Sequence, residues 1–452
     1  MKSGKRSSKR SSLGKKILYV FTSLLGVVVI LMSCAYGAFY HYYSRMNIIS
    51  EGEEDFEYVS DAEIRQGEDI DTDTMSEEDL KKLEEIERSY KPGGISFDFS
   101  DSDITNIMIA GTDSRMRGRY RTNSDSMVLV SINRKTKKIF FTSFMRDILV
   151  DVPKGGNHLK AGKAKLNSAF GYGGSQMMFK TYENNFGIKI DKYVHMDFYN
   201  FISIINYLDG VDMYVKAEEI KVMNEVYIYE MNRAYHLPNS QVYMPEKSGN
   251  YHLNGIQALA YTRVRYVGGG DFGRTERQRK VIAEIMKKVK SMSASKLSKF
   301  ADVVLRYVST NVSQKEVMSL LVNAPEYLGY EQVNSRIPID NTYHADKLQG
   351  AYVLIIDLQK NADYWYSLVY LDKDISEDIY TEIKIEKAHE EAKKTADKEA
   401  KKSDEDFMKL AQAAAAIAGV VPSDGETTSA DAGTASGEAN NSSEAAASSD
   451  GG

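Results

Sequence analysis

Two aspartates lie on either side of a basic loop in the first third of the chain. An apolar run that begins at Ile104 ends just before Asp113, and a second apolar run begins at Met127, just after Asp125. If these runs are neighbouring antiparallel strands, their ends share one edge of a sheet and the two carboxylates face each other. Carboxylate oxygens are the ligands that hard divalent cations prefer. The stretch therefore predicts a metal site, and a solvated loop with ordinary ion pairs is the alternative.

The loop between the two aspartates is rich in arginine. Its members are Arg115, Arg117, Arg119 and Arg121. Guanidinium groups bind phosphate oxygens through pairs of charge-assisted hydrogen bonds, so the loop is suited to a phosphate ligand. Arg146 and Asp147 lie between two later apolar segments, at another predicted strand end. Arg146 is a further candidate for the site, and a surface ion pair between the two residues is the alternative.

A second group of candidate residues lies further along the chain. Arg263 and Arg265 are two positions apart, and in an extended segment this spacing directs both guanidinium groups to one face. A helix predicted from about Arg274 places Arg274 and Gln278 on the stripe of its apolar residues. A cation near a helix N-terminus opposes the macrodipole at a cost of about 0.3–1 kcal/mol unless an anion lies there. The pattern predicts an anion between helix and sheet; the alternatives are a purely structural Arg274 and a capping box of Thr275 with Gln278.

The candidate residues belong to a domain that we predict over residues 101–372. Apolar runs typical of strands alternate there with amphipathic helices, which favours an α/β fold with a single mixed β-sheet flanked by helices. The polar segment between the second and third strands is predicted to be a turn, so the sheet begins as a meander. One helix is predicted from Ser175 to Gly187. His195 lies between apolar residues, where a packed, hydrogen-bonded side chain is expected rather than a catalytic one.

The two ends of the chain differ from this domain in composition. Residues 1–16 are basic and residues 17–43 contain no Asp, Glu, Lys or Arg, which predicts a cytoplasmic segment, one transmembrane helix and a main domain outside the cell. A cleaved signal peptide is the alternative. Residues 44–100 are acidic and predict a spacer with one helix. Residues 373–421 predict a charged, alanine-rich helical extension, and residues 422–452 a disordered acidic tail.

The overall composition argues against several classes of function. The net charge of −6 gives no reason to expect a nucleic-acid partner. The chain has no Walker loop, Ser-His-Asp set or HExxH motif, so nucleotide hydrolysis, acyl transfer and zinc proteolysis lack their parts. Clustered arginines are costly to bring together unless a multiply charged anion lies among them. A pyrophosphate with a divalent cation fits this set of residues best.

Five blocks of the sequence resemble the LytR-CpsA-Psr family of cell-envelope proteins. The first block contains Asp113 and Asp125, and the second is SFMRD, where the family usually has Ser-x-Pro-Arg-Asp. The remaining blocks contain Lys165, Arg263 with Arg265, and Arg274 with Gln278. The chain departs from the family pattern at Met145, which replaces the proline, and at Asn123, which replaces an arginine.

The resemblance implies a membrane-anchored phosphotransferase with a lipid-linked substrate. Such an enzyme moves an anionic glycan, for example teichoic acid or capsular polysaccharide, from polyprenyl pyrophosphate onto peptidoglycan. By this resemblance Asp113 and Asp125 hold Mg²⁺ or Mn²⁺, and with Arg146 and Arg274 they form the catalytic set. The groups assigned to the lipid pyrophosphate are Arg115, Arg121, Arg146, Lys165, Arg263, Arg265, Arg274 and Gln278.

We expect the metal and the arginines to stabilise the departing phosphate. Asp113 or Asp125 would help to deprotonate the attacking sugar hydroxyl. Two other functions remain open at this point: a pyrophosphatase that acts on polyprenyl pyrophosphate, and a non-enzymatic regulator of the envelope or attenuator of transcription. An outward-facing, membrane-anchored domain is not expected to contact DNA.

Overall fold

The computed structural model describes most of the predicted main domain and the helix that follows it. The described residues are 37, 40, 44, 47–48, 70, 75–89, 95, 97, 103–112, 123–154, 162–235 and 242–417. Asp113, Arg115 and Arg121 lie outside them, as do the predicted tail and nearly all of the predicted membrane segment. None of the helices in the described ranges has both the length and the apolar composition that a membrane crossing requires.

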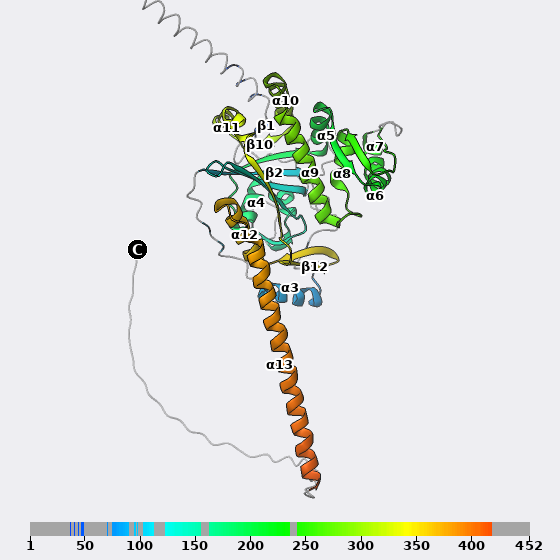
Figure 1. Ribbon diagram of the computed structural model, residues 1–452, viewed down its shortest axis with the longest axis vertical. Helices are drawn as coiled ribbons and strands as arrows, with labels where there is room; N and C mark the ends of the chain where they lie inside the picture. The colour runs from blue at the N-terminus through cyan, green and yellow to red at the C-terminus, as the bar shows by residue number, and fades with distance from the viewer. Residues whose placement is uncertain are drawn as a thin grey trace, which may run out of the picture. The chain divides into compact units, whose positions relative to one another are not determined.

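A mixed sheet of seven strands forms the centre of the domain (Figure 1). In spatial order the strands are β1 (Asn47–Ile48), β10 (Ser309–Thr310), β7 (Lys192–Asp197), β2 (Ile104–Thr112), β3 (Ser124–Asn133), β4 (Lys138–Phe144) and β11 (Glu331–Ile337). The predicted meander is confirmed, because β2, β3 and β4 are consecutive antiparallel neighbours. β2 runs parallel to β7, and β4 runs parallel to β11.

The prediction of a single sheet needs a correction. The described residues also form three two-stranded sheets, each with its strands antiparallel. Their pairs are β5 (Leu149–Val152) with β6 (Gly162–Lys165), β8 (Val211–Val215) with β9 (Gly249–Leu253), and β12 (Tyr343–Leu348) with β13 (Ala351–Ile356). Short apolar runs do not reveal from sequence which strands join one sheet.

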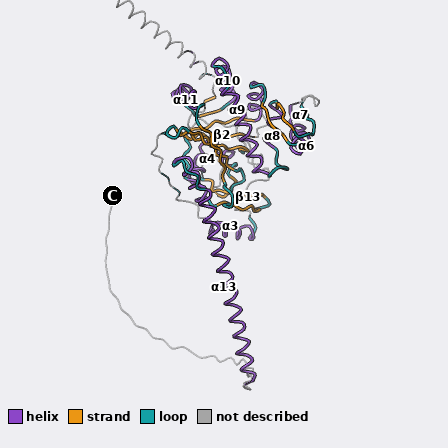
Figure 2. The backbone as a smooth tube through the Cα atoms, in the orientation of Figure 1, coloured by secondary structure: helices purple, strands orange, loops and turns teal. Residues whose placement is uncertain are grey.

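Helices cover both faces of the central sheet, as predicted (Figure 2). Because side chains alternate along a strand, Leu129 and Phe140 face one side, where α4 (Ser168–Phe186) and α12 (Leu358–Tyr370) supply the core. Val128 and Phe141 face the other side, where they share a cluster with Ile282 of α9 (Gly270–Lys290) and a residue of α11 (Gln314–Tyr327). The central sheet is therefore held between two packed layers of helices.

A second hydrophobic cluster joins α9 to a group of smaller elements. They are α5 (Phe198–Tyr207), α6 (Ala217–Val222), the π-helix η2 (Met223–Ile228), α7 (Tyr229–Tyr235) and α8 (Gly255–Arg263), with β8 and β9. Val281 belongs to this cluster, whereas its neighbour Ile282 packs on the sheet. α10 (Ala294–Tyr307) packs on α5 through Phe300. α9 is thus fixed on two sides, which positions its first turns.

Two local predictions differ from the structure in detail. α4 begins at Ser168, although non-helical backbone at Gly173 and Gly174 separates its first turn from the part predicted to start at Ser175. It ends at Gly187, as predicted, where the backbone is left-handed. The helix assigned to the spacer, α3 (Glu77–Ser89), is not detached from the domain, because Leu83 is buried in one cluster with residues of β5 and β13.

The last described helix belongs to two structural units. α13 (Ser376–Ile417) contributes Ile379 and Ile383 to the core of the first unit. The second unit begins at Lys384, and its described residues continue the same helix to Ile417. A helix over most of the predicted extension is therefore confirmed.

Candidate functional site

The site lies where β2 ends and β3 begins. The register pairs Ala110 with Met127 and, after an irregularity, Thr112 with Ser124. Asp125 is the next residue along β3, and Asp113, the residue after the end of β2, lies outside the described residues. The predicted sharing of one sheet edge by the ends of the two strands is therefore confirmed.

Arginines from separate parts of the chain surround Asp125. Arg146 follows β4, and its Nη1 lies 2.7 Å from Asp125 Oδ1. Arg265 follows α8, and its Nη2 lies 3.8 Å from the same oxygen. Burial alone would raise the pKa of Asp125, but Arg146, Arg274 and Arg265 outweigh it and hold the pKa below its ordinary value. Asp125 is thus kept ionised by the cations around it.

A second carboxylate, Asp147, lies beside the same arginine. Its Oδ2 accepts a hydrogen bond from Arg146 Nε at 3.3 Å, and its Oδ1 lies 3.0 Å from Lys165 Nζ. Lys165 is at the end of β6 and is almost fully buried. Burial alone would raise the pKa of Asp147, but Arg146 and Lys165 lower it by more, so the net shift is downward. The predicted Arg146–Asp147 pair exists, but it lies in the interior and involves Lys165.

Arg274 is the most buried arginine of the site, with 2% of its surface exposed. Its Nη1 lies 3.2 Å from Asp271 Oδ1, one turn earlier in α9. Burial lowers the pKa of Arg274 to about 10; Asp271 acts in the opposite direction, while Arg265 and Arg146 lower it further. Neither Nε nor Nη1 of Arg274 has a hydrogen-bond partner among the described residues. Such atoms are costly to bury unless a ligand or water accepts from them.

Gln278 reaches the sheet from the next turn of α9. Its Oε1 accepts a hydrogen bond from Ser126 Oγ at 3.3 Å. The alternative prediction of a capping box between Thr275 and Gln278 is wrong. α9 begins at Gly270, and Thr275 donates instead to the carbonyl oxygen of Phe272. The predicted buried stripe of α9 is confirmed at Arg274 and Val281.

The loop before α9 is held by a buried arginine that sequence reasoning did not single out. Residues 268–270 are glycines with φ of 62°, 89° and 59°, a left-handed conformation that disfavours other residues. Arg277 lies 3.4 Å from Glu219 Oε1 and donates to three backbone carbonyl oxygens of the loop. These belong to Val264, Val267 and Gly268. Arg277 thereby fixes the segment that carries Arg265.

Arg263 does not share the environment of Arg265. The prediction of an extended segment is wrong at this residue, because Arg263 is the last residue of α8. Its guanidinium lies 4.8 Å from the ring centre of Phe198 and 4.9 Å from that of Tyr227, and Nη1 lies 3.2 Å from Glu230 Oε2. The change from helix to extended backbone at Val264 sends the two arginines into different surroundings.

The role of the acids that compensate the arginines was only partly predicted from the sequence. Asp147 was considered only as a surface partner of Arg146, and Asp271, which contacts Arg265 and Arg274, was not named. Their positions next to Arg146 and three residues before Arg274 were the available signals. Two amides are also part of the site: Asn123 Oδ1 and both side-chain polar atoms of the fully buried Asn167 have no hydrogen-bond partner in the described structure.

The sequence also matches a known family model. The LytR_cpsA_psr family model matches residues 67–369. The chain belongs to this family. The resemblance seen in the five blocks is therefore confirmed, and the matched region includes α3 of the predicted spacer.

Two relatives and one solved structure illustrate the similarity. Biofilm regulatory protein A of Streptococcus mutans is 33% identical over 249 residues, which are 54% of this chain and 57% of that protein. The polyisoprenyl-teichoic acid–peptidoglycan teichoic acid transferase TagV of Bacillus subtilis is 31% identical over 216 residues, 47% of this chain and 51% of TagV. A crystal structure of a Streptococcus agalactiae protein aligns with a TM-score of 0.47 and 26% identity, covering 58% of this chain and 89% of that one. The chain thus spans little more than half the length of these two relatives.

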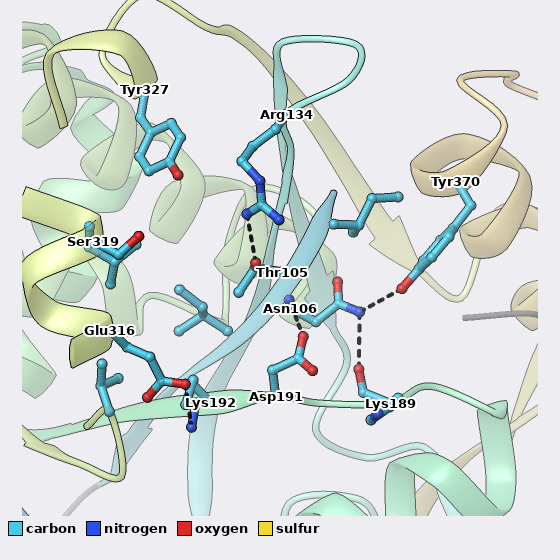
Figure 3. Close-up of a pocket in the computed structure, with 14 residues that line it drawn as sticks. Thr105, Asn106, Arg134, Lys189, Asp191, Lys192, Glu316, Ser319, Tyr327 and Tyr370 are labelled. Carbon is cyan, nitrogen blue, oxygen red and sulfur yellow. Dashed lines mark hydrogen bonds and ion pairs between the residues drawn. The ribbon is translucent and has the colours of Figure 1, made fainter. Parts of the chain in front are cut away.

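A cavity of about 470 Å³ lies at the other end of β2 in this LytR-CpsA-Psr protein (Figure 3). Tyr327 and Tyr370 lie on opposite sides of it, and its polar groups are largely bonded to one another. Lys192 Nζ lies 3.0 Å from Glu316 Oε1, and Arg134 donates to Thr105 Oγ1 at 3.0 Å. We therefore rank this cavity below the β2–β3 edge as a site for an anion.

His195 has the structural role that was expected. It is buried, and its Nε2 lies 2.8 Å from Thr112 Oγ1. Its ring stacks on Phe170 with 5.0 Å between ring centres. Burial lowers the pKa of His195 to about 4, so the ring is neutral at neutral pH. Its place on β7 supports the end of β2, next to the site.

Proposed function

We propose that the chain transfers an anionic glycopolymer from a polyprenyl pyrophosphate carrier onto peptidoglycan. The observation that carries the proposal is the convergence of Arg146, Arg265 and Arg274 on Asp125 at one edge of the sheet. The name of TagV describes transfer of teichoic acid from a polyisoprenyl carrier to peptidoglycan. Family membership and the site chemistry support the same class of reaction for this chain.

The unmet hydrogen-bonding capacity of the site favours a diphosphate ligand. Among the described residues, Nε of Arg274 is buried without a hydrogen-bond partner, and Nη1 lies near Asp271 Oδ1 without forming a hydrogen bond to it. Lys165 and Arg146 both contact Asp147, and each carries several N–H donors. Guanidinium groups bind phosphate in two parallel hydrogen bonds, and a diphosphate offers enough oxygens for several cations at once. Burial lowers the pKa of Arg274, and the charges of Arg265 and Arg146 lower it further; a bound diphosphate would offset this charge repulsion.

A divalent cation fits the oxygen atoms at the strand ends. Both contacts of Asp125 given above use Oδ1, and Asn123, two residues earlier, has a buried Oδ1 without a partner. Within the described ranges no three His, Cys, Asp or Glu side chains gather as ligands. We propose that Asp125 holds Mg²⁺ or Mn²⁺ together with Asp113 of the undescribed loop. When bound, the ion supplies positive charge that stabilises phosphate oxygens.

The proposed reaction is a phosphoryl transfer to a sugar hydroxyl. The hydroxyl oxygen of peptidoglycan forms a bond to the phosphorus that carries the glycopolymer. The bond from this phosphorus to the bridging oxygen breaks, and polyprenyl phosphate leaves with its electron pair. Arg146, Arg265 and Arg274 stabilise the negative charge on the leaving group. The proton of the hydroxyl passes to a carboxylate.

Asp125 is a weak base in the ligand-free site, because the arginines hold its pKa low. Phosphate oxygens beside the same arginines would offset their charge and raise the pKa of Asp125. Substrate binding would thereby prepare Asp125 to accept a proton. Asp113 is the other candidate for this role.

The proposal also places the domain outside the cell, tethered through residues 17–43. Protease accessibility on intact cells would test this location.

The proposal is tested by coupling lipid-linked glycan to peptidoglycan with the purified full chain. Wild type should form the coupled polymer and release polyprenyl phosphate, whereas Arg274→Ala and Asp113→Ala should not. Arg306→Ala is the matched control, because Arg306 is on α10 and pairs with Asp302 of the same helix. Undiminished coupling by both site variants would overturn the residue roles. Release of phosphate from the carrier without acceptor would instead indicate a pyrophosphatase.

A further inference from the structure

Two arginines outside the site described above lie close to each other. Arg279 is on α9, next to Gln278, and Arg336 is on the edge strand β11. Burial lowers the pKa of Arg279, and the charge of Arg336 lowers it further, whereas Glu276 acts in the opposite direction. The Nη1 atom of Arg279 is buried and has no hydrogen-bond partner among the described residues. Like charges with an unmet donor are typical of a place that an anion occupies.

The surroundings hold the guanidinium group of Arg336 in place. Arg336 lies 4.3 Å from the ring centre of Phe272, and its Nε donates to the carbonyl oxygen of Pro338 at 3.0 Å. Phe272 is seven residues before Arg279, so both lie on one stripe of α9. Tyr343 packs on Phe272 with 4.9 Å between ring centres. Arg336 is therefore preorganised on an aromatic base, and Arg279 lies on the same stripe of α9 as this base.

A buried hydroxyl adds a third group to this cluster. Ser143 of β4 is the register partner of Arg336. Because side chains alternate, Ser143 faces the same side of the sheet as Phe141, which packs in one cluster with Ile282 of α9. Its Oγ is buried and has no hydrogen-bond partner in the described structure. A hydroxyl can donate to a phosphate oxygen, as the guanidinium groups do.

The acids near the two arginines are engaged at the surface. Glu276 lies 2.7 Å from Lys280. Asp340 pairs with Arg336 Nη2, but its side chain is 78% exposed and the pair is open to water. Such exposed pairs contribute little and exchange readily for a stronger partner. Neither acid removes the unmet donor of Arg279.

The cluster lies at the same end of the sheet as the first site. The carbonyl oxygen of Ile337, next to Arg336, accepts from the backbone N–H of Met145 at 2.9 Å. Met145 directly precedes Arg146, which binds Asp125. On α9, Arg279 directly follows Gln278, which reaches Ser126. A ligand chain that leaves the first site along α9 would thus meet Arg279 and Arg336.

We infer that Arg279, Arg336 and Ser143 form a second phosphate-binding site, which takes a phosphate group of the glycopolymer rather than of the lipid pyrophosphate. The inference rests on the proposed function, because it assumes that the polymer enters through the first site. It assigns to this site a preference for glycans whose backbone carries phosphodiesters, over neutral glycans on the same carrier.

The test compares two lipid-linked substrates that share the pyrophosphate and differ only in the glycan. One carries a poly(glycerol phosphate) chain and the other a neutral glycan of equal length. In the full chain, the double variant Arg279→Gln/Arg336→Gln should lower kcat/KM for the phosphate-bearing substrate by about tenfold or more and leave the neutral substrate unchanged. Equal losses on both substrates, or no loss on either, would overturn the inference. Arg306→Gln is the control for a lost surface arginine.

A binding measurement separates the inference from the proposed function. Lipid-free glycerol phosphate oligomers, and inorganic phosphate as a second probe, are titrated into the full chain by calorimetry. The oligomers should bind wild type and lose about tenfold in affinity in the double variant, with matched melting curves as the folding control. Unchanged oligomer affinity in the variant, or binding of inorganic phosphate alone, would overturn the inference even if transfer occurs. If the wild-type protein binds the oligomers but does not transfer glycopolymer to peptidoglycan, only the proposed function is overturned.

Discussion

The two ends of β2 differ in how fully their charges are matched. At the C-terminal end, cations from three segments converge on Asp125, and the buried Nε of Arg274 has no hydrogen-bond partner among the described residues. At the N-terminal end there is a cavity, but Lys192 and Arg134 already contact Glu316 and Thr105. Among the described residues, one buried polar side-chain atom there, Asn106 Oδ1, lacks a hydrogen-bond partner. Hollow space alone therefore does not identify an anion site in this fold; repelling cations with unmet donors do.

The largest expected effect tests this comparison directly. Arg274→Ala should lower kcat/KM for glycopolymer transfer by at least about 100-fold, because it removes charge at the developing phosphate leaving group. Arg134→Ala, at the other end of β2, should change kcat/KM by less than about twofold. Both values come from initial rates of coupled product. Equal losses in the two variants would abolish the distinction between the two ends.

Acid titration provides the second test, through Asp125. Because the folded-state pKa of Asp125 is lowered, its ion pairs stabilise the fold above the unfolded pKa of about 3.9 and stop doing so as pH falls through the folded value. Wild type should therefore lose more in Tm than Asp125→Asn when pH falls from about 5 to 2, by a few degrees. Parallel Tm curves for the two proteins would show that the arginines do not stabilise this carboxylate.

How much of the fold and of the candidate site could be predicted from the sequence depends on the range of the interactions involved. The β2–β4 meander and the buried stripe of α9 follow from local alternation and spacing, and both were predicted. The separation of Arg263 from Arg265 was not, because it depends on where α8 ends. That helix ends at Arg263 and the backbone of Val264 is no longer helical, a boundary that residue spacing does not reveal.

The charge balance of the site shows the same limit. Asp147 and Asp271 are each adjacent in sequence or along a helix to an arginine; Asp147 was considered as a partner of Arg146, and Asp271 could have been named in the same way. The contact between Lys165 and Asp147 could not, because it needs β6 to pair with β5. Likewise, the unmet amide of Asn167 becomes visible only once its burial is known. Long-range pairing decides both, and a single sequence records it only indirectly.

Arg263 offers a smaller effect that sharpens the comparison within the site. Arg263→Met should destabilise the protein by about 1–2 kcal/mol, since it removes the ion pair to Glu230 and the contacts with Phe198 and Tyr227. The kcat/KM of the Arg263→Met variant for glycopolymer transfer should fall by less than about fivefold, which is far less than the loss expected for Arg274→Ala. Chemical denaturation and initial rates check the two values. A 100-fold loss of rate would show instead that Arg263 leaves the two rings to contact the substrate.

The smallest expected effect belongs to the cavity at the N-terminal end of β2. Lys192→Met removes the ion pair with Glu316, whose side chain is 42% exposed, so the loss of stability should stay below about 1 kcal/mol. Transfer should continue at the wild-type rate, because no substrate charge depends on a lysine that Glu316 already neutralises. A loss of transfer with unchanged denaturation would mean that this end also binds substrate. In that case a site with matched charges would also bind substrate, and unmet donors would not be necessary for a binding site.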